Sequence, residues 1–85
     1  MKEFTYTITN PSGLHGRPAA DLVTQAQAMD SAVTVRKGDK CVGADRLMAL
    51  MTLGAAQGDT ITVTVEGGDE EKALEQLRTY FAQNL

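Results

Sequence analysis

The sequence predicts an α+β fold in which a four-stranded antiparallel sheet is covered on one side by three helices, in the order β-α-β-β-α-β-α. Residues 2–9 and 60–66 alternate between apolar and polar side chains, as strands with one buried face do. Residues 17–28 and 70–83 instead place apolar side chains three and four positions apart, as amphipathic helices do. Because each strand has a single apolar face, one layer of helices can bury the sheet. The 85 residues are expected to form one domain, residues 1–85.

The first strand and the first helix flank a turn-rich stretch. The strand Lys2–Thr9 places three apolar side chains on one face, and Asn10-Pro11-Ser12-Gly13 ends it. The helix is predicted over Arg17–Ala28. Its apolar stripe is interpreted as core and consists of Ala19, Leu22, Val23 and Ala26.

A hairpin and a short helix are predicted next. Ala32–Lys37 and Lys40–Val42 are expected to pair through a turn at Gly38-Asp39. The helix is predicted over Asp45–Leu53, and apolar residues surround most of it. A helix this short cannot bury every face in so small a domain, so some of its apolar side chains are expected to form an exposed binding surface. The alternative is a fully packed helix. The residues expected to supply exposed positions are Leu47, Met48 and Met51.

The last strand and the last helix have the clearest local signals. Thr60–Glu66 places Ile61, Val63 and Val65 on one face. After a Gly-Gly turn, Asp69 is predicted to cap a helix that ends near Gln83. The buried face of this helix is expected to comprise Ala73, Leu74, Leu77, Tyr80 and Phe81.

Charge and composition argue against several classes of function. A net charge of −3 and a pI near 4.9 argue against binding to nucleic acid or acidic membranes. No apolar run can span a bilayer, and the N-terminus does not resemble a signal peptide, so a cytoplasmic protein without direct membrane insertion is expected. The single cysteine, Cys41, has no partner for an internal disulfide, and no metal-ligand cluster surrounds it or His15. Neither a metal nor another cofactor is expected.

The stretch Asn10–Ala20 is the candidate functional site. It contains the only histidine of the chain, His15, between two glycines. Pro18 suits the first turn of a helix, so His15 is expected at or just before a helix N-terminus. Helix N-termini bind phosphate through unpaired N–H groups, and Arg17 adds a guanidinium. A neutral imidazole here could accept a phosphoryl group whose charge the site then stabilises. The alternative is that His15 is only a solvated turn residue.

The run Gly13-Leu14-His15-Gly16-Arg17-Pro18-Ala19 resembles the active-site signature Gly-Leu-His-x-Arg-Pro-Ala of the HPr family. These are the histidine-containing phosphocarrier proteins of the bacterial phosphoenolpyruvate:sugar phosphotransferase system (PTS). Leu47–Gly54, followed by Gln57-Gly58, also resembles the family, and the length and the element order match throughout. The resemblance implies the HPr fold, an open-faced β-sandwich whose first two helices share one surface around the histidine.

The resemblance also implies a function. His15 would accept a phosphoryl group on Nδ1 from enzyme I, which takes it from phosphoenolpyruvate, and pass it to the A domains or subunits of enzymes II for sugar uptake and phosphorylation. The protein would be a monomeric carrier and not an enzyme. Arg17 and the backbone N–H groups near Gly16 and Arg17 would stabilise the phosphoryl oxygens. The partner-binding residues are expected to be Ala20, Arg46, Leu47, Met48 and Met51.

The chain departs from the family at the second helix. Many members carry a serine just before this helix that an ATP-dependent kinase phosphorylates, whereas this chain has Arg46. No regulatory phosphoserine is therefore predicted. The rim of the site is also less basic than in members with lysines there, so compatibility with another organism's enzyme I or enzyme II does not follow. The residues at the comparable places are Thr24, Gln27, Asp45 and Ala49.

Two other functions compete with the carrier. The first is a regulatory HPr-like protein that acts by docking to enzymes or transcription factors; the presence of both His15 and Arg17 favours the carrier over it. The second is a ferredoxin-like module that binds a ligand or a metal. It would leave the arrangement of His15, Arg17 and Pro18 unexplained, and the chain lacks a Cys-x-x-Cys motif.

Overall fold

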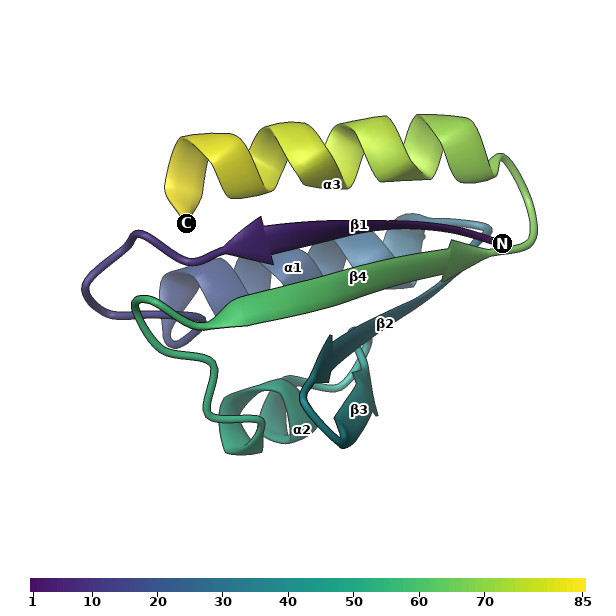
Figure 1. Ribbon diagram of the computed structural model, residues 1–85. Helices are drawn as coiled ribbons and strands as arrows, with labels where there is room; N and C mark the ends of the chain where they lie inside the picture. Colours follow the sequence, from purple (N-terminus) through teal and green to yellow (C-terminus); the bar gives the residue numbers. More distant parts are fainter.

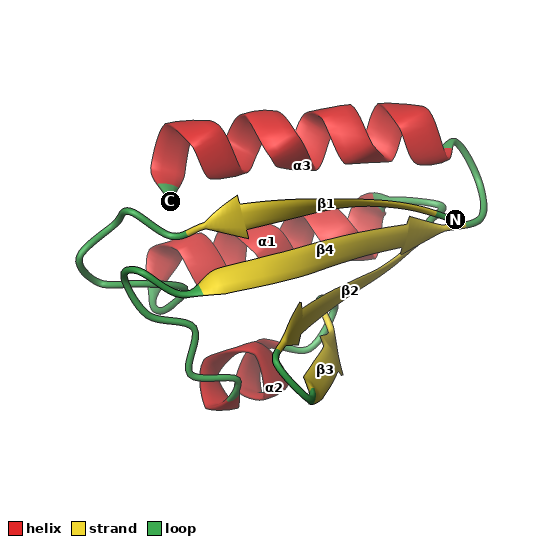
Figure 2. Ribbon diagram, viewed as in Figure 1, coloured by secondary structure: helices red, strands yellow, loops and turns green.

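The computed structural model describes residues 1–85 and contains seven elements in the predicted order (Figures 1 and 2). Four strands and three helices form the predicted α+β arrangement. In chain order the elements are β1 (Lys2–Thr7), α1 (Arg17–Ala28), β2 (Ala32–Lys37), β3 (Lys40–Gly43), α2 (Leu47–Thr52), β4 (Thr60–Glu66) and α3 (Glu70–Asn84).

The strands form one antiparallel sheet in the order β1-β4-β2-β3. The last strand in the sequence, β4, therefore lies between β1 and β2. Val63 of β4 pairs with Phe4 on one side and with Val35 on the other, and Val35 also pairs with Val42. Because β4 has neighbours at both edges, its entire apolar face is buried, which explains why this strand has the cleanest alternation in the sequence.

The helices cover one face of the sheet, as predicted. The buried valines and isoleucine of the strands lie on the covered face, whereas the threonines that alternate with them are exposed or half-buried. In Figure 1, α1 passes behind the strands and α3 runs along β1. The fully buried Phe81 of α3 packs edge-on against Phe4 and Tyr6 at centroid distances of 5.5 and 5.6 Å. This cluster anchors α3 to β1.

The first strand ends two residues earlier than the predicted Lys2–Thr9. The backbone leaves the sheet after Thr7, and the N–H groups of Thr9 and Asn10 donate to the Leu85 carbonyl oxygen instead of to a strand. The alternation of apolar and polar residues continues past Thr7, but the backbone there bonds to the end of α3 instead of to β4. The entrance to the His15 loop is thus tied to the last helix.

The second helix is shorter than the predicted Asp45–Leu53. It spans Leu47–Thr52 because Arg46 has an extended backbone, with φ −124° and ψ 110°, and therefore precedes the first turn. At the other end, the N–H of Leu53 donates to the carbonyl of Ala49, which closes the helix. Neither change alters which side chains this helix exposes.

Candidate functional site

The loop before α1 is organised by its own backbone turn. The Asn10 carbonyl oxygen accepts from the N–H of Gly13 at 2.9 Å, and the Asn10 side-chain oxygen accepts from the N–H of Ser12 at 2.8 Å. The amide nitrogen of the same side chain donates to the carbonyl of Asn84 at 3.0 Å. Asn10 therefore both shapes the loop and attaches it to α3.

Gly13 and Leu14 dock the loop on the segment between α2 and β4. Gly13 has φ 67°, and a Cβ at this position would lie 2.5 Å from the Ala55 carbonyl oxygen. This close approach and the positive φ both require glycine. The next N–H, that of Leu14, donates to the same Ala55 oxygen at 2.9 Å, and the Leu14 side chain is buried. Because Leu14 is anchored inward, the following residue, His15, begins an exposed stretch.

Gly16 directs the chain from the loop into α1. Its φ of 60° and ψ of −128° lie where glycine is favoured, and no other part of the protein lies within 4 Å of the place a Cβ would occupy. As the N-cap it offers no side-chain acceptor. The Gly16 carbonyl accepts from the N–H of Ala20 at 3.0 Å. The N–H groups of Arg17 and Ala19 have no acceptor in the protein, and Pro18 has no N–H. Two donors at the positive end of the helix dipole are therefore free for an anion.

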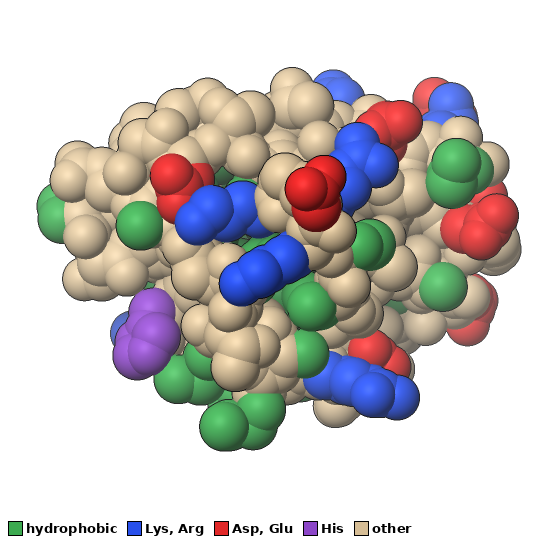
Figure 3. All heavy atoms as spheres, turned by 60° about the horizontal axis from the view of Figure 1, so that its bottom comes forward, with side chains coloured by type: hydrophobic (Ala, Val, Ile, Leu, Met, Phe, Trp, Pro, Cys, Tyr) green, Lys and Arg blue, Asp and Glu red, His purple; other side chains and the backbone are tan.

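The two side chains predicted to carry the chemistry are both exposed. His15 makes no side-chain hydrogen bond within the protein and lies on the surface with hydrophobic side chains exposed close by (Figure 3). The Arg17 side chain is 92% exposed, and its Nε lies 3.9 Å from Oδ2 of Asp21. At this separation the ion pair leaves the guanidinium free to move.

A hydrogen bond between α1 and α3 lies one turn from Arg17, and it was not predicted from the sequence. The Tyr80 hydroxyl donates to Oδ2 of Asp21 at 2.7 Å. Burial, and after it the hydrogen bond to the Asp21 carboxylate, raise the pKa of the Tyr80 phenol to about 12. The i, i+4 spacing of Arg17 and Asp21 was the only local signal of this arrangement.

The residues predicted to bind partners lie on α1 and α2, and these two helices are in contact. Met48 is 72% exposed and Leu47 is 39% exposed, whereas Met51 is half-buried. Ala20 and Arg46 are also exposed. The exposed apolar surface of α2 predicted from the sequence is therefore present, and the fully packed alternative is wrong. The side chains that α2 does bury are those of Leu50 and, just after the helix, Leu53.

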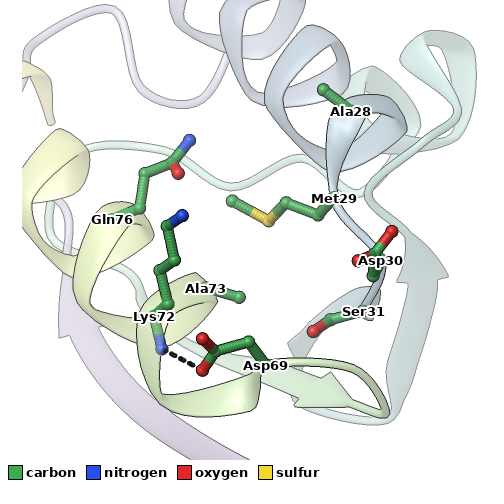
Figure 4. Close-up of a pocket in the computed structure, with 8 residues that line it drawn as sticks. All are labelled: Ala28, Met29, Asp30, Ser31, Asp69, Lys72, Ala73 and Gln76. Carbon is green, nitrogen blue, oxygen red and sulfur yellow. Dashed lines mark hydrogen bonds between the residues drawn. The ribbon is translucent and has the colours of Figure 1, made fainter.

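A pocket of about 340 Å³ lies between the end of α1 and the start of α3, at the opposite end of α1 from His15 (Figure 4). Three of its polar side chains make hydrogen bonds within the protein. The Ser31 hydroxyl donates to Gly67, Gln76 donates to Gln25, and Asp69 accepts from the backbone N–H of Lys72. No side chain of the His15 loop lines it. The lining residues are Ala28, Met29, Asp30, Ser31, Asp69, Lys72, Ala73 and Gln76.

Two further features bear on the class of site. No group of three or more histidine, cysteine or carboxylate side chains is placed to hold a metal ion. None of the helices has the length and apolar character needed to cross a membrane. The structure has an exposed histidine two residues before α1, whose first turn carries two free backbone donors and an exposed arginine. It also has an exposed apolar surface on α2, the helix that contacts α1.

Comparison with known proteins agrees with this fold. A family model described as the PTS HPr component phosphorylation site matches residues 2–83. The phosphocarrier protein HPr of Lysinibacillus sphaericus is 37% identical over 83 residues, which cover 98% of this chain and 94% of that protein. The crystal structure of HPr-C-His from Thermoanaerobacter tengcongensis is 43% identical, with a TM-score of 0.83 and 100% of both chains covered. A crystal structure of an HPr dimer from the same organism is 41% identical, with a TM-score of 0.76 and 98% and 95% of the chains covered.

The chain belongs to the HPr family, the phosphocarrier proteins of the phosphotransferase system. Its architecture is the open-faced β-sandwich of that family. The resemblance stated from the Gly13–Ala19 run is confirmed, and the ferredoxin-like alternative is wrong.

Proposed function

We propose that His15 accepts a phosphoryl group from phosphorylated enzyme I and passes it to the A domains or subunits of enzymes II. One observation supports this assignment above the others. His15 is exposed two residues before the start of α1, and the free N–H groups of Arg17 and Ala19 lie in the first turn of that helix.

Each transfer is a displacement at phosphorus. A lone pair on the neutral imidazole, at Nδ1 by analogy with the family, forms the new bond to phosphorus while the bond to the donor breaks. The group gained carries about two negative charges at neutral pH. The Arg17 guanidinium and the free N–H groups of the first helical turn would bind its oxygens. In the second transfer a nucleophile of the acceptor protein attacks, and the imidazole leaves with its electron pair.

The partner proteins would dock on the surface formed by Ala20, Arg46, Leu47, Met48 and Met51. Its support is the exposure of Met48 and Leu47 on a helix that contacts α1. A carrier must release each partner quickly, and a small apolar patch with a charged rim suits a transient interface. Methionine side chains adapt to surfaces of different shape, which fits docking to more than one partner.

We further propose that the chain works as a cytoplasmic monomer made of one domain, and as a carrier with no turnover of its own. Arg46 stands where many relatives have the regulatory serine, so a kinase that uses ATP should not phosphorylate this chain there. Incubation with such a kinase and labelled ATP checks this, and transfer of label would contradict it. The monomer is checked by the mass measured in light scattering, since an HPr of T. tengcongensis has been solved as a dimer.

The decisive experiment is phosphoryl transfer followed by intact mass. The protein is mixed with phosphoenolpyruvate and a catalytic amount of enzyme I from the organism that encodes it. We expect a gain of one acid-labile phosphoryl group, and no gain for His15→Ala. The loop backbone does not use the imidazole, so His15→Ala should fold normally. Absence of transfer with an enzyme I that phosphorylates its own carrier would refute the proposal and favour a docking protein without carrier activity.

A further inference from the structure

We propose that Asp21 is the resting-state counter-ion of Arg17, that Tyr80 holds this carboxylate in position, and that the pair limits how strongly His15 retains a phosphoryl group. This inference rests on the proposed function of His15. It assigns positioning roles to two residues that do not touch the phosphoryl group.

The three side chains meet at one atom. Oδ2 of Asp21 accepts from the Tyr80 hydroxyl at 2.7 Å and lies 3.9 Å from Nε of Arg17. Arg17 and Asp21 are one helical turn apart on α1, whereas Tyr80 belongs to α3. The carboxylate is therefore oriented from a second helix and is not simply a mobile surface charge.

The two interactions differ in tightness. The contact from Tyr80 is a short hydrogen bond from a half-buried side chain. The contact from Arg17 is at the outer limit of an ion pair, and its guanidinium is 92% exposed. The carboxylate is thus held by a hydrogen bond, whereas the guanidinium is not. Arg17 can leave Asp21 for an anion at the helix N-terminus without breaking a hydrogen bond.

The carboxylate opposes the phosphorylated state in two ways. Arg17 must give up its attraction to Asp21 in order to bind phosphoryl oxygens, and the negative Asp21 repels the new dianion near the same helix end. Both effects favour release. A carrier benefits from this arrangement, because a phosphoryl group held too firmly would not pass to an acceptor. The effect of one exposed charge pair corresponds to a change of about two- to fivefold in an equilibrium constant.

The test is a competition for phosphoryl groups. Phosphorylated wild type, labelled with nitrogen-15 so that the masses separate, is mixed with unlabelled Asp21→Asn and a catalytic amount of enzyme I. At equilibrium the variant should hold the phosphoryl group about two- to fivefold more strongly than the wild type. Asparagine keeps the shape of the side chain and an oxygen for the Tyr80 hydrogen bond, so folding should be preserved.

Two further variants make the result specific. Asp30→Asn removes the same charge from an exposed residue beyond the far end of α1, and it should partition equally with the wild type. Tyr80→Phe frees the carboxylate without removing it, and it should shift the equilibrium in the same direction as Asp21→Asn but less. Equal partitioning of Asp21→Asn and Asp30→Asn would overturn the proposal.

A measurement without enzyme I separates this proposal from the function on which it rests. Inorganic phosphate is titrated into the wild type and into Asp21→Asn, and the Arg17 Nε–H resonance is followed by NMR. Tighter phosphate binding by Asp21→Asn, again about two- to fivefold, supports the counter-ion role even if enzyme I transfers nothing. Unchanged phosphate binding, with an Arg17 resonance that is the same in both proteins, refutes it.

Discussion

The replacement of Gly13 by alanine should destabilise the fold through the docking of the His15 loop. Gly13 has φ 67°, where a residue with a Cβ costs about 1–2 kcal/mol. The new Cβ would lie 2.5 Å from the Ala55 oxygen and 2.9 Å from the Cα of Ala56, and both are backbone atoms. The loop must move, and the hydrogen bond from Leu14 to Ala55, worth about 0.5–1.5 kcal/mol, is weakened. The expected loss in the free energy of unfolding is the sum of these two contributions, about 1.5–3.5 kcal/mol.

A matched glycine separates the two causes. Gly38 has a similar φ of 58°, but nothing lies within 4 Å of its missing Cβ. Gly38→Ala should therefore cost only the backbone strain, about 1–2 kcal/mol. Urea unfolding followed by circular dichroism measures both variants, and hydrogen exchange of the Leu14 amide reports on the weakened contact. If Gly13→Ala loses no more stability than Gly38→Ala, the close approach to Ala55 does not hold the loop and the reasoning is wrong.

Three more predictions concern docking and pH. Met48→Ala should raise the KM of enzyme I for this chain in the transfer assay. The free energy of unfolding should stay within about 0.5 kcal/mol of wild type, because the Met48 side chain is 72% exposed. A KM equal to that of the wild type would show that Met48 does not belong to the docking surface. The hydrogen bond from the N–H of Ala56, and after it the one from Lys37, hold the pKa of Asp59 below its usual value. The stability that the Asp59 carboxylate contributes is therefore complete above the unfolded pKa of about 4 and is lost as the pH falls through the pKa of the folded protein. Asp59→Asn should therefore lower the free energy of unfolding at neutral pH, and the variant should lose less stability on acidification than the wild type does. Urea unfolding across the acid range measures both effects. The pKa of Tyr80 is raised to about 12 in the folded protein, so the stabilisation that the Tyr80 hydroxyl contributes is complete below the unfolded pKa of about 10 and is lost as the pH rises toward 12. Tyr80→Phe should therefore lose less stability in alkali than the wild type does. An unchanged dependence of stability on alkaline pH would contradict this.

Local sequence signals predicted the elements because their causes are local. The bounds of α1, β2 and β4 agree with the predicted ranges, since apolar periodicity and caps depend on residues within one or two turns. The boundaries that differed lie where the chain gains a distant partner or turns early. The N–H of Thr9 bonds to Leu85, and Arg46 remains extended before α2.

Within the candidate site, the sequence was informative about which residues are present and less so about what surrounds them. The Gly13–Ala19 run predicted a histidine before a helix N-terminus, and the exposure of Leu47 and Met48 was expected from the shortness of their helix. The contact between Tyr80 and Asp21 was not expected, because these residues are 59 positions apart. The local patterns placed Tyr80 on the buried face of its helix and Asp21 four residues after Arg17, but neither pattern indicates that these two side chains meet.

The sequence by itself determined the element order, the single apolar face of each strand and the family, because periodicity and a short contiguous motif are written in neighbouring residues. Only the tertiary structure decided that β4 is inserted between β1 and β2, that Ala55 receives the hydrogen bond from Leu14, and that Tyr80 fixes the carboxylate beside Arg17. Each of these depends on segments that meet only after the sheet has formed. Chain connectivity alone does not specify which of many compatible side chains will face one another across packed elements.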